Sequence, residues 1–212
     1  APGRVAWALE NLPGTHVVTS SFGAQAAVML HLAAARERRL PVILLDTGHL
    51  FPETYRFVDE LTERLGLDLR IYRAPQSAAW QEARYGRLWE QGPAGLERYL
   101  QLNKVEPLQR ALRELGAGTW LSGLRRAQST SRAAIRYAEQ RDGRWKIHPL
   151  ADWTDRDVGR YLRAHALPYH PLWERGYVSI GDWHSTRSLA EAGSAEQVRF
   201  GGQRRECGIH GL

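Results

Sequence analysis

The chain has 212 residues, 43% of them hydrophobic and 25% charged, which is the composition of a globular protein with a sizeable core. No apolar run approaches the ~18–20 residues that span a bilayer, and no basic-then-apolar secretory segment opens the chain, so we expect no membrane partner. The chain has 29 lysines and arginines against 23 aspartates and glutamates, which gives a net charge of +6. Almost all of these cations are arginines, whose planar guanidinium suits phosphate and sulfate. The excess therefore indicates either an anionic partner or a solvated basic surface.

The cysteine content narrows the chemistry further. Cys207 is the only cysteine, which excludes an intramolecular disulfide and any all-cysteine zinc or iron–sulfur site within one chain. The histidines lack the spacing of metal ligands, so we expect no metal site. A reducing compartment fits this cysteine usage, and we expect a cytoplasmic protein. The eight tryptophans are scattered through different segments, so we expect no nucleic-acid partner.

Apolar, β-branched runs alternate with amphipathic stretches along the first two thirds of the chain. The runs predict strands at residues 15–20, 41–46, 67–72 and 119–123 and an edge strand at 144–148, and the stretches predict helices at 24–39, 52–65, 76–90, 105–116 and from 155 onward. This alternation predicts an α/β fold with a doubly wound, mostly parallel sheet flanked by helices. We expect one domain over residues 1–187 and a flexible C-terminal arm over residues 188–212, because the latter segment is polar and glycine-rich.

Two polar loops follow neighbouring predicted strands. Residues 20–25, Ser-Ser-Phe-Gly-Ala-Gln, join the first strand to the first helix, where backbone N–H groups can bind an anion. The loop is neither a Walker A motif nor G-x-G-x-x-G, and a serine-capped turn is the alternative. Asp46 ends the second strand, where it could accept a hydrogen bond from a ribose or an adenine amine, or cap the turn before the Pro52 helix. Both loops lie at the carboxyl edge of the sheet, and together they favour a nucleotide pocket.

Seven motifs then give the sequence a specific character. In chain order they are Ser20–Gly23, Leu45–Thr54, Trp80–Gly86, Gly123–Arg126, Tyr169–Trp173, Gly176–Asp182 and Glu206–His210. Together they resemble the phosphoadenylyl-sulfate (PAPS) reductases of bacterial sulfate assimilation, and the similarity runs essentially from Val5 to His210.

The resemblance implies an adenine nucleotide α-hydrolase-like fold and the reduction of PAPS to sulfite and adenosine 3′,5′-bisphosphate. It also implies thioredoxin or glutaredoxin as electron donor, and a homodimer. ATP-cleaving proteins of this fold carry Ser-Gly-Gly-x-Asp-Ser in the first loop, from which Phe22 and Gln25 depart. A sister branch that reduces adenylyl sulfate (APS) carries further cysteines for a [4Fe–4S] cluster, and this chain has none to supply them. The resemblance therefore implies the PAPS branch and no iron–sulfur cofactor. An adenylyltransferase on the same fold and a basic nucleotide- or RNA-binding module are the alternatives.

Carried over to this chain, the resemblance makes Cys207 the nucleophile, which forms an S-sulfocysteine that thioredoxin or glutaredoxin resolves. Arg204 and Arg205 would favour its thiolate and Glu206 would oppose it, while His210 could act as a second cation or a proton donor. The remaining expected substrate-binding residues are Ser20, Ser21, Phe22, Gly23, Gln25, Asp46, Thr47, Gly48, Lys104, Arg125, Arg126, Arg132, His184, Thr186 and Arg187. Arg125 and Arg126 are the first candidates for the phosphosulfate, because positive charge must offset the repulsion between a thiolate and an anionic substrate.

Overall fold

The computed structural model describes residues 1–202, 208 and 209. In this part of the chain one sheet contains the strands β1 (Thr15–Thr19), β2 (Pro41–Leu45), β3 (Asp68–Tyr72), β4 (Ala117–Ser122), β5 (Ala138–Arg141) and β6 (Arg144–Ile147). Their spatial order is β3-β2-β1-β4-β6-β5, and every neighbouring pair is parallel except the antiparallel pair of β5 and β6. The predicted α/β fold with a mostly parallel sheet is confirmed.

The helices lie between and around these strands. They are α1 (Pro2–Asn11), α2 (Ala27–Ala34), α3 (Pro52–Leu65), α4 (Ala78–Tyr85), α5 (Gly92–Leu100), α6 (Glu106–Glu114), α7 (Asp155–Ala164) and α8 (Leu189–Ala192), with a π-helical turn at Gln101–Val105 between α5 and α6. Short 3₁₀ turns occupy Leu88–Glu90, Arg126–Gln128, Thr130–Arg132, Pro171–Arg175, Trp183–Ser185 and Phe200–Gly202. None of the helices that the structure describes has the length and hydrophobicity that a membrane span requires.

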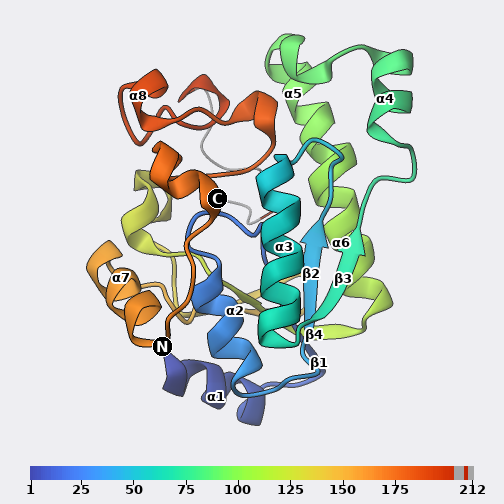
Figure 1. Cartoon of the computed structure of the whole chain (residues 1–212). Helices are drawn as coiled ribbons and strands as arrows, with labels where there is room; N and C mark the ends of the chain where they lie inside the picture. Colours follow the sequence, from blue (N-terminus) through green and yellow to red (C-terminus); the bar gives the residue numbers. More distant parts are fainter. Residues whose placement is uncertain (203–207, 210–212) are drawn as a thin grey trace.

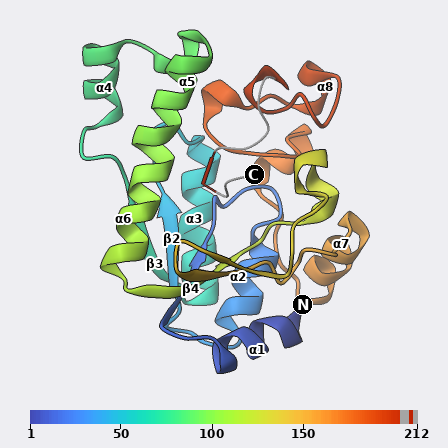
Figure 2. The same cartoon turned by 180° about the vertical axis from the view of Figure 1, so that it is seen from behind.

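Helices cover both faces of the sheet. The helices α1, α2, α3 and α7 pack on one face, in front of the strands in Figure 1, while α6 packs on the other face and comes forward in Figure 2. Successive strand residues point to opposite faces. On β1, Val18 therefore enters the core beneath α2 and Val17 the core beneath α6, and both are fully buried. The continuous apolar runs of the sequence reflect this burial on both sides.

The connections reverse direction at β1. The chain runs from β1 outward through β2 to β3 and then returns to place β4 on the other side of β1. The carboxyl ends of β1 and β4 consequently lie side by side while their following segments diverge, which is the geometry of a ligand crevice in open α/β sheets. The helices α4, α5 and α8 extend beyond this edge (Figures 1 and 2).

Two local predictions need correction. The strand expected at the sheet edge, now β6, is covered by β5, so β5 is the edge strand on that side. Asp142 and Gly143 join these strands, and both have positive φ, as the two-residue hairpin turn favoured by Asp-Gly requires. The helix expected over residues 24–39 is shorter because residues 24–26 form a turn, and α2 begins only at Ala27.

The ends of two other helices agree with their sequence signals. The helix α3 starts at Pro52, and Gly66 follows its last turn with φ of 62°, in the left-handed region that glycine adopts without a Cβ penalty. The helix α7 begins with a capping box, in which the Thr154 hydroxyl accepts from the Asp157 N–H and the Asp157 carboxylate accepts from Thr154.

Residues 188–202 pack against the rest of the domain. Val198 is fully buried, its carbonyl accepts from the N–H of Arg187, and Phe200 joins a small core with Tyr99 and Leu100 of α5. The predicted mobility of the C-terminal arm stays a prediction, since most of its last ten residues lie outside the described part of the chain.

The buried His170 is expected to make folding sensitive to acid. Its Nδ1 accepts from the N–H of Leu172, so Nε2 carries the hydrogen that is donated to Thr54 Oγ1 at 3.0 Å. Burial lowers the pKa of His170 from 6.5 to about 4. A proton therefore binds the unfolded chain more strongly, and this contribution to stability is present above pH 6.5 and is lost as the pH falls toward 4.

The matched variant is His170→Asn, whose side-chain oxygen can accept from Leu172 but does not titrate. Urea unfolding between pH 7 and pH 4 should show a shallower loss of unfolding free energy in His170→Asn than in the original chain, by at most about 3 kcal/mol. Equal slopes for the two proteins would contradict the assignment.

Candidate functional site

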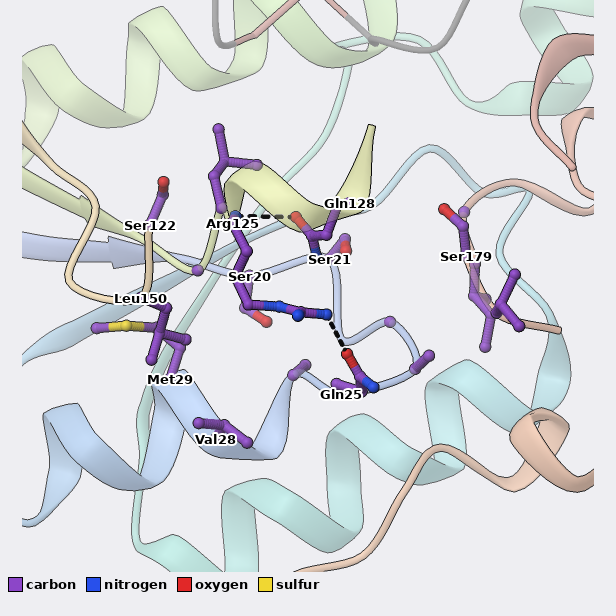
Figure 3. A pocket seen from close by; sticks show the side chains of 18 of the residues that line it. Ser20, Ser21, Gln25, Val28, Met29, Ser122, Arg125, Gln128, Leu150 and Ser179 are labelled. Atoms are coloured by element: carbon purple, nitrogen blue, oxygen red, sulfur yellow. Dashed lines mark hydrogen bonds between the residues drawn. The ribbon is translucent and has the colours of Figure 1, made fainter. Parts of the chain in front are cut away.

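A cleft of about 410 Å³ opens at the carboxyl edge of the sheet, where the connections reverse. It lies between the loop after β1, the segment after β4 and residues 178–181, and Figure 3 shows side chains from all three directed toward it. The volume is in the range of small-molecule sites. Its lining combines apolar residues of α2 and β2 with serines, amides and arginines, so it suits a ligand with both an apolar ring and anionic groups.

The loop after β1 has a strained backbone that divides its side chains between core and cleft. Phe22 has φ of 49°, unusual for a residue with a bulky side chain, and its N–H donates to Ser20 Oγ at 3.0 Å. The Phe22 ring is fully buried in the core and does not line the cleft. Ser20, Ser21 and Gly23 do line it. This arrangement presents small side chains and backbone amides to a ligand just before α2.

Arg125 is a buried cation of the cleft that is held by several hydrogen bonds. It lies just after β4, is only 4% exposed, and donates to Gln25 Oε1 at 2.6 Å (Figure 3). It also donates to Asp155 Oδ1 at 2.8 Å. A third hydrogen bond reaches the carbonyl of Trp153 at 3.2 Å. Gln25 and Arg125, each predicted to bind substrate, are thus in direct contact. The hydrogen bond to Asp155 also connects Arg125 to the start of α7.

The side chains of the other two arginines expected in this region, Arg126 and Arg132, point to different places. Arg132 lines the cleft and donates to Gln128 Oε1 at 2.5 Å. Arg126 does not line it, because its guanidinium lies over the Tyr137 ring, 4.7 Å from the centroid, and donates to the carbonyl of Ile135. The structure therefore brings Arg125 and Arg132 to the cleft and directs Arg126 elsewhere.

Asp46, at the start of the loop after β2, accepts hydrogen bonds from the loop itself and from α3. Asp46 Oδ1 accepts from the N–H of Gly48 at 2.9 Å and from the Tyr55 hydroxyl at 2.7 Å. This is the turn-capping arrangement that the sequence left open for Asp46. Neither Asp46 nor Gly48 lines the cleft, and the nearest contribution of this loop is that of Leu45 and Leu50.

A buried carboxylate connects that loop to the far wall of the cleft. Asp182 is inaccessible to solvent and accepts from Thr47 Oγ1 at 2.7 Å, Tyr99 OH at 2.9 Å and Lys104 Nζ at 3.0 Å. Burial acts to raise the pKa of Asp182, but the Lys104 ammonium and the Thr47 hydrogen bond outweigh it and hold the pKa below its ordinary value. Lys104 lines the cleft from the π-helical turn, so its ammonium is held at the wall by Asp182.

The remaining predicted residues of this region, His184, Thr186 and Arg187, follow Asp182 in the sequence and lie outside the cleft. The His184 ring stacks on Trp89 at 4.0 Å between centroids, and burial lowers its pKa to about 4, so it is neutral at pH 7. The Thr186 hydroxyl donates to the Asp182 carbonyl at 2.9 Å and closes the turn. The Arg187 side chain is exposed, and none of the three lines the cleft.

Several lining residues were not expected from the sequence. They are Ser122, Gln128, Asp155, Ser179 and Arg199. The Arg199 guanidinium lies so close to Gly181 that a Cβ at this position would clash with it. Gly181 belongs to the motif Gly176–Asp182, but no local sequence pattern connects it to Arg199, eighteen positions later. Only the packing of residues 188–202 brings Arg199 there.

The predicted nucleophile and its neighbours, Arg204, Arg205, Glu206, Cys207 and His210, lie outside the described residues. Ile209, two positions beyond Cys207 in the sequence, is described and lines the cleft, where it packs against the core beneath α6.

The doubly wound sheet, the amide-rich loop at the strand reversal and the buried arginine beside it define a nucleotide-binding α/β protein. Residues 15–188 match the family of the Phosphoadenosine phosphosulfate reductase domain, and the chain belongs to this family.

Individual relatives agree with this assignment. The chain is 62% identical to the Phosphoadenosine 5′-phosphosulfate reductase of Alkalilimnicola ehrlichii over all 212 of its residues, which cover 86% of that protein. Among solved structures it is similar to the PAPS reductase of Candida auris in its phosphate complex, with a TM-score of 0.77, 34% identity, and coverage of 88% of this chain and 89% of that one. Its similarity to Candida glabrata FMN adenylyltransferase, with a TM-score of 0.64, 15% identity and coverage of 90% of this chain and 63% of that one, shows the shared fold alone.

The pair of Lys104 and Asp182 yields a stability prediction. Lys104→Met leaves the Asp182 carboxylate buried without its cation, and removal of one partner of a buried pair costs about 3–5 kcal/mol. The double variant Lys104→Met/Asp182→Asn should recover part of that loss, as measured by urea unfolding at pH 7. The control is Arg175→Met, which removes the exposed partner of Glu53 at 3.4 Å and should cost less than about 1 kcal/mol. Equal losses in Lys104→Met and Arg175→Met would contradict the prediction.

Proposed function

We propose that the chain reduces PAPS to sulfite and adenosine 3′,5′-bisphosphate. The observation that carries the proposal is the cleft itself, which joins an anion-binding loop to buried cations in a member of the PAPS reductase family. In this proposal the apolar lining from α2 and β2 contacts the adenine ring, and the amides after β1 bind phosphate oxygens. Arg125, Arg132 and Lys104 supply positive charge at the cleft wall.

The first chemical step is a transfer of the sulfonate group to the protein. The Cys207 thiolate attacks the sulfur of PAPS, a bond forms between Sγ and that sulfur, and the sulfur–oxygen bond to the phosphate breaks. Adenosine 3′,5′-bisphosphate leaves with the electron pair, and the enzyme holds an S-sulfocysteine. The cations of the cleft offset the repulsion between the thiolate and its anionic substrate. The presence of Ile209 in the cleft wall supports a reach of this segment to the substrate.

The second step needs two electrons, which a dithiol donor such as thioredoxin or glutaredoxin supplies. Its first thiolate attacks Sγ of Cys207, the bond from Sγ to the sulfonate breaks, and sulfite leaves with the electron pair. The second thiol of the donor then resolves the mixed disulfide, so Cys207 returns to the thiol and the donor becomes a disulfide. The reaction requires no resident metal or cluster.

The cysteine content supports this branch of the chemistry. A four-cysteine [4Fe–4S] cluster cannot be built within a chain that has one cysteine. The proposal further includes a homodimer and a cytoplasmic location, where thioredoxin and glutathione systems keep thiols reduced.

Intact-protein mass after incubation with PAPS, without a donor, tests the proposed intermediate. We expect one added sulfonate group, its absence in Cys207→Ser, and its release as sulfite when reduced thioredoxin is added. APS in place of PAPS should give far less adduct. An absent adduct, or an adduct that persists in Cys207→Ser, would refute the mechanism.

Two adjacent arginines provide a matched test of the cleft. Arg125→Ala should weaken binding of adenosine 3′,5′-bisphosphate by roughly 10- to 100-fold, because hydrogen bonds to charged groups contribute about 1.5–3 kcal/mol. Arg126→Ala should leave the affinity almost unchanged, since that side chain lies on Tyr137. Titration calorimetry of both variants, with circular dichroism to confirm folding, decides the point. A larger effect of Arg126→Ala would show that the nucleotide occupies a different surface.

A further inference from the structure

Ser122 is a serine of the cleft wall whose hydroxyl is hydrogen-bonded to a histidine. It is the last residue of β4, only 2% exposed, and it lines the cleft from the strand next to the anion-binding loop. Figure 3 shows the Ser122 side chain at the end of its strand, pointing away from Leu150 and Met29. Its Oγ lies 2.7 Å from Nδ1 of His148, the residue that follows β6. The parallel pairing of Leu121 with Ile147 brings these two strand ends together.

The neighbours of His148 determine which of its nitrogens carries the hydrogen. Nε2 lies 3.5 Å from the Glu139 carboxylate, whose oxygens only accept hydrogen bonds. Glu139 is in turn 3.7 Å from the ammonium of Lys146, its cross-strand partner on β6. The carboxylate favours the tautomer with hydrogen on Nε2, so Nδ1 is an acceptor and the Ser122 hydroxyl must donate to it.

His148 keeps this role across the physiological range. It is fully buried, and burial together with the nearby Lys146 ammonium lowers its pKa to about 4. The ring is therefore neutral at pH 7, and Nδ1 stays available to accept.

A serine whose only hydrogen is committed can offer a ligand nothing but oxygen lone pairs. We propose that Ser122 is a specificity-determining residue that accepts a hydrogen bond from a donor group of the bound nucleotide. Phosphate and sulfate oxygens do not qualify, because they are acceptors. On the nucleotide of the proposed function, on which this inference rests, the available donors are the adenine 6-amino group and the ribose 2′-hydroxyl.

Calorimetric binding of adenosine 3′,5′-bisphosphate tests the assignment without any redox step. Two analogues separate the donors, namely the inosine counterpart, in which an acceptor replaces the amino group, and the 2′-deoxy counterpart, which lacks the hydroxyl. The original chain should bind one of the two at least about tenfold more weakly than the adenosine compound, equivalent to about 1.4 kcal/mol. Ser122→Ala should lose that discrimination while it keeps any discrimination against the other analogue.

Two further variants guard the interpretation. Ser122→Cys keeps the side-chain volume but replaces the oxygen by a weak acceptor, so it should also lose the discrimination if Ser122→Ala does not fold. Ser179→Ala removes a serine from the opposite part of the same cleft and should retain the original ratio of affinities.

The outcomes separate the inference from the proposed function. If the original chain binds neither PAPS nor adenosine 3′,5′-bisphosphate, the proposed function fails and this inference fails with it. If it binds the nucleotide and the Ser122 variants discriminate against both analogues as the original chain does, the proposed function stands and the role of Ser122 is refuted.

Discussion

The structure depends on the reversal of strand order at β1. Because β1 and β4 are parallel neighbours whose following segments leave in opposite directions, a crevice must open at their carboxyl ends. The last residues of the two strands, Thr19 and Ser122, are paired in register, and Ser20 directly follows Thr19. The loop before α2 and Arg125 therefore line the same cleft, and Arg125 donates across it to Gln25 at 2.6 Å.

The buried charge differs on the two sides of this crevice, with a cation on one side and a carboxylate on the other. On one side Arg125 is surrounded by neutral and acidic acceptors that fix its direction. On the other, Asp182 gathers Thr47, Tyr99 and Lys104, and so connects three separate segments through one carboxylate. A buried carboxylate with three donors costs less than an unpaired one, but it also means that a change at any donor disturbs the other two. Hydrogen bonds to one carboxylate thus hold together the irregular segments next to the cleft.

Local sequence patterns predict the elements that depend on residues close together in the chain. The buried strands and the ends of α3 and α7 follow from apolar runs, Pro52, Gly66 and Thr154. The strand β5 is polar and has no apolar run that would predict it, although the Asp-Gly turn before β6 is a recognised hairpin signal.

The site shows the same limit. Ser20, Gln25, Arg125 and Arg132, all expected to bind substrate, line the cleft, while their binding of a substrate stays a prediction. The direction of a side chain within a motif does not follow from the motif. The Arg126 guanidinium lies over the Tyr137 ring and donates to the Ile135 carbonyl, and the Phe22 ring is buried where its backbone enters the left-handed region.

The hairpin that extends the sheet past β6 also affects how the molecule can meet copies of itself. An edge strand with free N–H and C=O groups invites another strand to pair with it. Here β5 carries Glu139 and Arg141, and the opposite edge, β3, carries Asp68 beside Arg70 at 2.9 Å. Charged side chains on both edge strands oppose the edge-to-edge pairing of sheets from different molecules. Pairing of these edges between two copies of the chain is therefore disfavoured, which leaves helices and loops as the surfaces through which copies would meet.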